Sequence, residues 1–216
     1  MKNLVCCISF LLVLTACSEK KQHFKIEGTV SNRMLNGKNI IFRKSVDGNA
    51  LINDTLKIQK SAFAWKGSVK APEVRNVLLP ETGAESFLVV LEKGDITINI
   101  DGDTALVGGT PLNEILQARV TQNRQNMRQL MAIDNAYMAK ADSMKVTPEE
   151  EAAYQAERTA LIVQNTDNII AFIKENIDNV VGKYFFMKHY LYFPRERKDQ
   201  LKAIATDDLK ALYGIE

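Results

Sequence analysis

The pattern of apolar residues changes its period at Thr110-Pro111, and this change constrains the fold more than any other feature. Before it, apolar and polar residues alternate, as in residues 24–30, which is typical of a strand with one face in water. After it, residues 112–144 contain neither Gly nor Pro and carry an apolar stripe at helical spacing. The chain is therefore predicted to be an α+β protein whose strands precede its helices.

Seven short segments in the first half are predicted strands, separated by turn dipeptides such as Asn36-Gly37 and Asp47-Gly48. Phe63 and Trp65 point to one face of their strand and are expected in the core. The last two strands flank Glu92-Lys93-Gly94 and are expected to form a hairpin. Their number and spacing predict an antiparallel β-sandwich or barrel over residues 24–109. The seven segments are residues 24–30, 39–42, 51–58, 62–69, 75–79, 86–91 and 95–100.

Residues 110–216 are predicted to be a helical region that begins with a long antiparallel hairpin. Thr110 can cap the first helix, and Pro111 suits its first position. Thr147-Pro148-Glu149-Glu150 carries the pattern of a capping box and starts the second helix, which is expected to reach residue 177. Helices of this size are on the order of 45–50 Å long, so part of the hairpin is expected to project or to pack on a partner.

The second helix is expected to bury an apolar stripe, and three shorter helices are expected after it. Pro194 is expected to end the first of these three, which is rich in aromatic residues. The expected short helices cover residues 180–192, 198–204 and 207–213. The residues of the second helix expected to be buried are Leu161, Ile162, Ile169, Ile170 and Ile173.

Residues 1–16 indicate a lipoprotein signal peptide. Lys2 is followed by an apolar run over residues 4–14, which has the length of a signal core and is too short to cross a bilayer comfortably. Leu14-Thr15-Ala16-Cys17 matches a lipobox, so we expect cleavage before Cys17 and lipidation of its thiol. The alternative is an ordinary secretory signal that ends near a cysteine. Residues 17–23 are then a short polar tether.

Lipid on Cys17 would fix the location and remove the chemistry of the thiol. Several acyl chains exceed the two signals that stable membrane anchoring requires. Ser18 and Glu19 do not resemble an inner-membrane retention signal, which favours the outer membrane of the cell envelope. Cys6 and Cys7 would leave with the signal peptide, so the mature chain would form no disulfide and support no cysteine chemistry.

The remaining residues give no catalytic, cofactor or metal-binding pattern. His23 lies in the tether, and His189 on the aromatic helix is expected to be a core or interface residue. Cys/His spacings typical of metal sites do not occur. The formal net charge of only +2 provides no basic field for nucleic acid.

Three local patterns have structural interpretations that we prefer to functional ones, and a fourth pattern suggests a modification. Asp101-Gly102-Asp103 is expected to be the turn at the end of a hairpin rather than a calcium loop. Gly108-Gly109 lacks phosphate-binding spacing and is expected at a domain junction. Glu149–Glu151 are expected to complement a helix dipole. The pattern Asp-Ser/Thr-apolar makes Thr55, Thr104 and Ser143 candidate O-glycosylation residues of a Gram-negative envelope protein.

The order of several motifs resembles the domain of unknown function 4369 (DUF4369) family. The motifs are FKIEGTV at residues 24–30, SAFAWKG at 61–67, EKGD at 92–95 and GGTPLN at 108–113. The resemblance implies an N-terminal β-module of Gram-negative envelope lipoproteins. In such proteins it is commonly followed by helices and then by a thioredoxin-like thiol–disulfide oxidoreductase domain of the peroxiredoxin-related (AhpC/TSA) type. Here the sequence ends at Gly214-Ile215-Glu216 without a Cys-x-x-Cys motif, so that redox activity is not expected.

These observations favour a non-enzymatic, membrane-anchored envelope protein that binds a protein partner. One alternative is an accessory protein that docks a separately encoded thioredoxin-like oxidoreductase. A second alternative is an enzyme that uses Asp, Glu, Ser or Arg alone, which would need a polar cleft with converging carboxylates.

Overall fold

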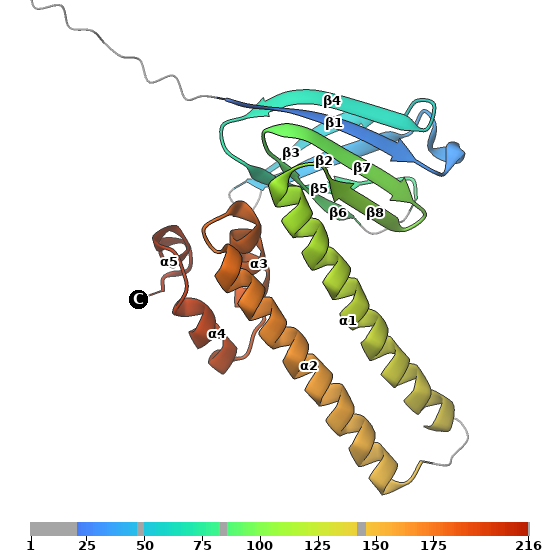
Figure 1. Cartoon of the computed structure of the whole chain (residues 1–216), viewed down its shortest axis with the longest axis vertical. Coiled ribbons are helices and arrows are strands. Elements are labelled where there is room, and N and C mark those ends of the chain that lie inside the picture. The colour runs from blue at the N-terminus through green and yellow to red at the C-terminus, as the bar shows by residue number, and fades with distance from the viewer. Residues whose placement is uncertain (1–20, 47–49, 83–85, 142–145, 216) are drawn as a thin grey trace, which may run out of the picture.

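The computed structural model describes residues 21–46, 50–82, 86–141 and 146–215. Within these ranges eight strands precede five α-helices, so the predicted α+β class is confirmed (Figure 1). The predicted signal peptide, Cys17 and Ser143 lie outside the described residues. The strands are β1 (Gln22–Val30), β2 (Asn39–Val46), β3 (Ala50–Lys57), β4 (Ala62–Val69), β5 (Glu73–Leu78), β6 (Phe87–Leu91), β7 (Gly94–Asp101) and β8 (Thr104–Gly108). The helices are η1 (Arg33–Leu35, a 3-10 helix), α1 (Pro111–Ala141), α2 (Pro148–Asn176), α3 (Val180–Tyr190), α4 (Arg195–Lys202) and α5 (Asp207–Tyr213).

The strands form two four-stranded sheets that pack face to face as a sandwich. The first sheet has the order β4-β1-β7-β8, and the second has the order β3-β2-β5-β6. The antiparallel prediction holds for every described pair except β1 and β7, which run parallel. β1 begins at Gln22, so Gln22 and His23 belong to the first sheet rather than to the predicted tether of residues 17–23.

The prediction that residues 86–91 and 95–100 form a hairpin is wrong. β6 pairs with β5 in the second sheet, whereas β7 pairs with β1 and β8 in the first. The chain passes from one sheet to the other at Glu92 and Lys93. Gly94 then starts β7 with a φ of 128°, a conformation that L side chains rarely adopt. Turn residues such as Glu92-Lys93-Gly94 suit both a hairpin and a crossing between sheets. The turn sequence therefore did not distinguish these two connections.

An eighth strand, β8, lies where the sequence analysis placed only a turn before the helices. The turn itself is correct, because Asp101 pairs with Thr104 and Gly102 has a φ of 55°. Beyond it, Ala105 and Val107 are buried while Leu106 is exposed. This alternation is the signal that could have identified the strand.

The first core fills the space between the two sheets. Phe24, Ile26 and Val30 point into it from β1, and Phe63 is buried with them, as predicted. Trp65 is half-buried and packs against the same core. Gly28 belongs to the inward row of β1, where an added Cβ would lie 2.0 Å from the Phe63 ring. The alternation in residues 24–30 therefore marks the strand face that points into the core. On this face position 28 must be small, because the Phe63 ring covers it.

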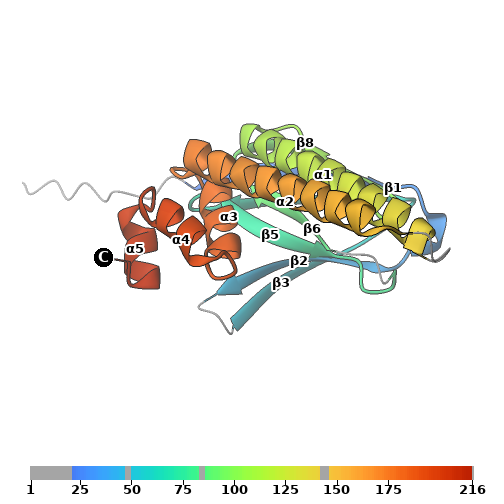
Figure 2. The same ribbon diagram turned by 90° about the horizontal axis from the view of Figure 1, so that it is seen from below.

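A second core lies between the outer face of β5–β6 and the helices. Val90 enters it from the sheet side, and Phe186 and Leu201 are completely buried on the helical side. Figure 2 shows α3 beside β5, with α4 on the side of α3 away from the sheet and β3 at the far edge of the sheet. The described chain therefore has three layers, and its helices cover the outer face of the second sheet along β5 and β6.

The predicted helices are present, with differences in burial and in their ends. Thr147 caps α2 in a capping box with Glu150, as predicted. Ile173 is completely buried in α2, but Ile162 is 40% exposed, against prediction. Leu161, Ile169 and Ile170 are half-buried. Pro194 does not end α3, which stops at Tyr190, but instead precedes α4 as its N-cap residue.

Candidate functional site

The hairpin of α1 and α2 projects from the sandwich, and its outer part is a helical arm (Figure 1). We define the arm as residues 127–141 of α1 and residues 148–172 of α2. The buried residues of α1 all precede it, the last being Asn126, and the buried residue of α2, Ile173, follows it. The described part of the arm therefore contains no buried side chain, and the arm extends the molecule without adding to either core.

Stacked rings and polar contacts join the two helices of the arm. Tyr137 and Tyr154 stack with ring centroids 4.0 Å apart. The Tyr154 hydroxyl donates to Asp134 Oδ1 at 3.0 Å, and Arg158 Nε donates to the same oxygen at 3.0 Å. Tyr137 donates to Glu151. The pKa of Tyr154 is raised, first by partial loss of water between the helices and then by its hydrogen bond to Asp134. These pairs fix the register of the helices and leave their outer surfaces free.

One side of α1 in the arm presents a row of exposed methionines. Met127, Met131 and Met138 are 52%, 56% and 54% exposed. At 100° per residue they fall within about 40° of one another around the helix. Exposed apolar patches on soluble proteins mark interaction sites, and methionine adapts its shape to different partners. We call these three residues the methionine row, which is the most distinctive exposed feature of the arm.

The backbone N–H groups at the start of α1 have hydrogen-bond acceptors within the protein. Glu92 Oε1 accepts hydrogen bonds from the amides of Leu112 at 2.8 Å and Asn113 at 3.1 Å. The amide of Gly109 donates to Glu114 Oε1 at 2.9 Å. These N–H groups would bind an anion at an open helix start. Carboxylates of the chain already occupy them, and Gly108-Gly109 lies where β8 ends, two residues before α1 begins.

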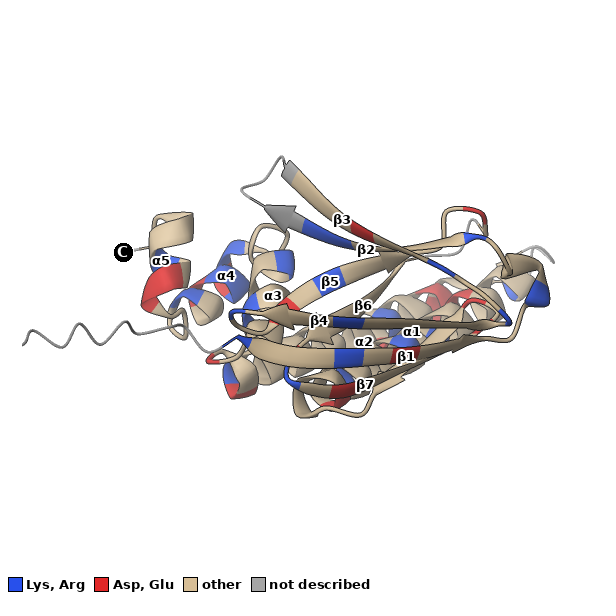
Figure 3. Ribbon diagram, turned by 90° about the horizontal axis from the view of Figure 1, so that it is seen from above, with Lys and Arg blue, Asp and Glu red and all other residues tan. Residues whose placement is uncertain are grey.

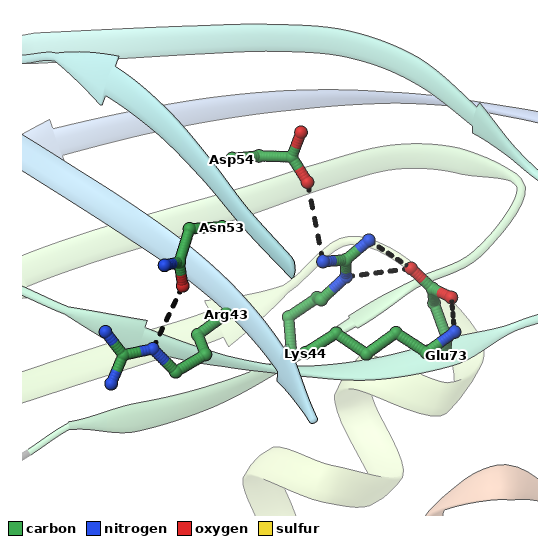
Figure 4. A network of polar contacts seen from close by, with 6 residues as sticks. Arg43, Lys44, Asn53, Asp54 and Glu73 are labelled. Carbon is green, nitrogen blue, oxygen red and sulfur yellow. Dashed lines mark hydrogen bonds and ion pairs between the residues drawn. The ribbon is translucent and has the colours of Figure 1, made fainter. Parts of the chain in front are cut away.

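An ionic cluster lies at one end of the sandwich, on the inward side of the second sheet (Figure 4). Arg75, only 7% exposed, pairs with Glu73 at 2.6 Å and with Asp54 at 3.4 Å, and Lys44 pairs with Glu73. Each cation thus has a carboxylate partner, and the four formal charges cancel. The cluster closes the end of the apolar core and keeps no net charge for a ligand.

The sequence-predicted residues do not converge on one place. Thr55 on β3 and Thr104 on β8 are exposed, and they belong to different sheets. His23 is exposed on β1. His189 is half-buried and packs against the second core, stacked on Phe185 with 6.1 Å between ring centroids. Burial, assisted by the nearby charges of Lys188 and Arg119, lowers the pKa of His189 to about 4.

The charge pattern and composition of the described residues give further observations. Acidic and basic residues are interspersed over β1, β4, β5 and β7, as Figure 3 shows. Within the described ranges, three or more His, Cys, Asp or Glu side chains do not gather into a possible metal site. No helix in these ranges is both long enough and apolar enough to cross a bilayer.

Comparisons with known proteins identify one part of the chain. Neither the curated proteins nor the solved structures include a significant match. A family model described as "Domain of unknown function (DUF4369)" matches residues 24–116. The matched segment contains the whole sandwich after its first two residues and ends within the first turns of α1. The chain therefore carries a domain of the DUF4369 family over residues 24–116, joined to a helical region.

Proposed function

We propose that this protein is a membrane-anchored lipoprotein of the cell envelope that binds a protein partner without catalysis. The observation that carries the proposal is the arm, which projects from the body, buries none of its described side chains and exposes the methionine row. An isolated two-helix hairpin gains little from its own packing, because helices are stabilised mainly by burying an apolar face. A partner that covers the methionine row would supply this burial.

The short tether would hold the sandwich close to the membrane, and the arm is long enough to project from it. Four residues separate Cys17 from the first residue of β1. At about 3.6 Å per residue, lipid on Cys17 would hold the start of the sandwich within roughly 18 Å of the membrane. Residues 127–141 of α1 extend about 22 Å at 1.5 Å per residue. The sandwich would thus act as a base close to the bilayer, from which the arm presents its surface to a partner.

Cross-linking in intact cells, followed by affinity purification, tests the role of the arm. Replacing the methionine row by Met127→Ser, Met131→Ser and Met138→Ser should remove the cross-linked partner. Gln125→Ser, Gln129→Ser and Asn135→Ser form the matched control, because these exposed residues lie on the same helix. Circular dichroism should show equal helicity in both triple variants. A partner captured equally by wild type and both variants would place docking elsewhere, and capture of none would count against the proposal.

Fractionation of cells that express Cys17→Ser tests the anchor independently. Without the acceptor thiol, the protein should leave the membrane fraction while keeping its fold. Persistence in membranes would contradict lipidation at Cys17. Recovery of a thioredoxin-like oxidoreductase in the cross-linking experiment would specify the class of partner.

A further inference from the structure

An open cavity of about 330 Å³ lies at the root of the arm, between α1 and α2, with much of its boundary exposed to solvent. It is separate from the methionine row, from the ionic cluster and from the capped start of α1. Its volume is at the lower end of the range typical of small-molecule sites. The residues that line it include Ala118, Arg119, Gln122, Asn168, Phe172 and Glu175.

Arg119 is unusual among the residues that line this cavity. Its side chain is only 5% exposed, yet within the described chain it forms no ion pair and no hydrogen bond. Its guanidinium contacts the Phe172 ring in a cation–π interaction, with Cζ 5.7 Å from the ring centroid. Buried charges in proteins are normally paired, because removing an ion from water is unfavourable even after the protein relaxes around it. The same burial lowers the pKa of Arg119.

A second donor without an acceptor lies on the same side of α1. Asn126 is 6% exposed, and its Oδ1 accepts a hydrogen bond from Gln122 Nε2 at 2.8 Å. Its own amide nitrogen has no acceptor among the described residues. Asn126 follows Arg119 by seven residues, about two helical turns, so both side chains face α2. The root of the arm therefore contains buried donors in excess of acceptors.

We infer that this cavity is a binding site for a small organic anion, whose carboxylate pairs with the Arg119 guanidinium and whose apolar part contacts Phe172. A guanidinium presents its N–H groups in a planar fork that matches a carboxylate. Glu175 lines the cavity from α2, and its carboxylate disfavours multiply charged anions such as phosphate. The site thus selects a monocarboxylate with an apolar group, and it is independent of the proposed docking of a protein on the arm.

Calorimetric titration of the purified full-length protein with sodium benzoate tests the site. Sodium chloride should hold the ionic strength constant, and sodium acetate and inorganic phosphate are the comparison ligands. We expect saturable binding of benzoate, weaker binding of acetate and none of phosphate. Arg119→Gln should weaken benzoate binding at least about tenfold. Arg128→Gln is the matched control, because Arg128 is an exposed arginine of the same helix, and it should leave the affinity unchanged.

Two further measurements keep the result interpretable. If Arg119→Gln loses helicity, the Nε–H resonance of Arg119 in the wild-type protein provides the readout, since benzoate should shift it to saturation. Glu175→Gln should strengthen benzoate binding by removing a like charge. The inference is overturned if wild type shows no saturable binding, if Arg119→Gln binds as tightly as wild type, or if phosphate binds in preference to benzoate.

Discussion

The side chain of Asn113 pairs with the backbone of Val90 as a neighbouring strand would. Val90 N–H donates to Asn113 Oδ1, and Asn113 Nδ2 donates to Val90 O, both at 2.8 Å. Val90 lies on β6, the edge of the second sheet. Gln117 Oε1 accepts from the Val107 amide on β8, the edge of the first sheet, at 2.8 Å. The first turns of α1 thus satisfy the edges of both sheets and join the sandwich to the arm.

Asn113→Ala should strongly destabilise the protein, because it leaves the buried N–H and C=O groups of Val90 without partners. We expect a loss of about 2–4 kcal/mol in the free energy of unfolding. Denaturant titration measures it. Asn123→Ala is the control, since Asn123 is exposed on the same helix and should change stability by less than about 0.5 kcal/mol. Equal effects of the two substitutions would show that the Asn113–Val90 pair is not important for stability.

Glu92→Ala should destabilise the junction by removing the acceptor for the first amides of α1. The expected loss is about 1–2 kcal/mol, and Glu92→Gln should lose less because it keeps an oxygen acceptor without the charge that favours a helix start. Thermal unfolding of both variants, beside Glu81→Gln at an exposed turn, provides the measurement. A Glu92→Gln variant less stable than Glu92→Ala would contradict the capping role.

Thr147→Ala should loosen the beginning of α2 with little effect on the two cores. Thr147 Oγ1 accepts from the Glu150 amide at 3.2 Å, and Glu150 Oε2 accepts from the Thr147 amide at 3.1 Å. Loss of such a cap costs about 1 kcal/mol. Hydrogen exchange should accelerate in the first turns of α2, while exchange in β1 and β7 stays at the wild-type rate. Thr159→Ala, at an exposed position within α2, should not produce this local acceleration.

His189 should make the protein less stable as the pH falls from about 6.5 toward 4. Its pKa is lowered from 6.5 to about 4, chiefly by burial. In this window the unfolded chain binds more protons than the folded one, so the free energy of unfolding rises with pH. His189→Phe should flatten that dependence in urea titrations at several pH values, whereas His23→Gln, at an exposed histidine, serves as the control. An unchanged slope in His189→Phe would contradict the lowered pKa.

Arg119 provides an independent check on the same histidine. Its positive charge is one of the causes that lower the pKa of His189, after burial and Lys188. Arg119→Gln should therefore raise the pKa of His189 toward its usual value without restoring it fully. A titration of the histidine ring resonances measures this shift, and Arg128→Gln should leave it unchanged. A downward shift in Arg119→Gln would contradict the proximity of the two charges.

The candidate sites differ in how far the sequence reveals them. The length of the helices already predicted a projecting hairpin, because each residue adds a fixed rise. The sequence placed Met127, Met131 and Met138 in the apolar stripe of α1. Only the structure shows that α2 packs on a neighbouring side of that helix, so that these three methionines stay exposed. The cavity at Arg119 gave no signal, since an arginine within a polar helical segment is normally solvated.

The sequence alone determined the class of the fold, the position of the switch from strands to helices and the capping of α2, because periodicity and helix caps depend on residues close together in the chain. The tertiary structure decided which strands share a sheet. Residues 86–91 and 95–100 lie in different sheets. Glu92, predicted as a turn residue, accepts hydrogen bonds from the start of α1, and the Asn113 side chain pairs with the backbone of Val90. These outcomes depend on which surfaces bury one another across long sequence separations, and a local turn such as Glu92-Lys93-Gly94 is compatible with more than one of them.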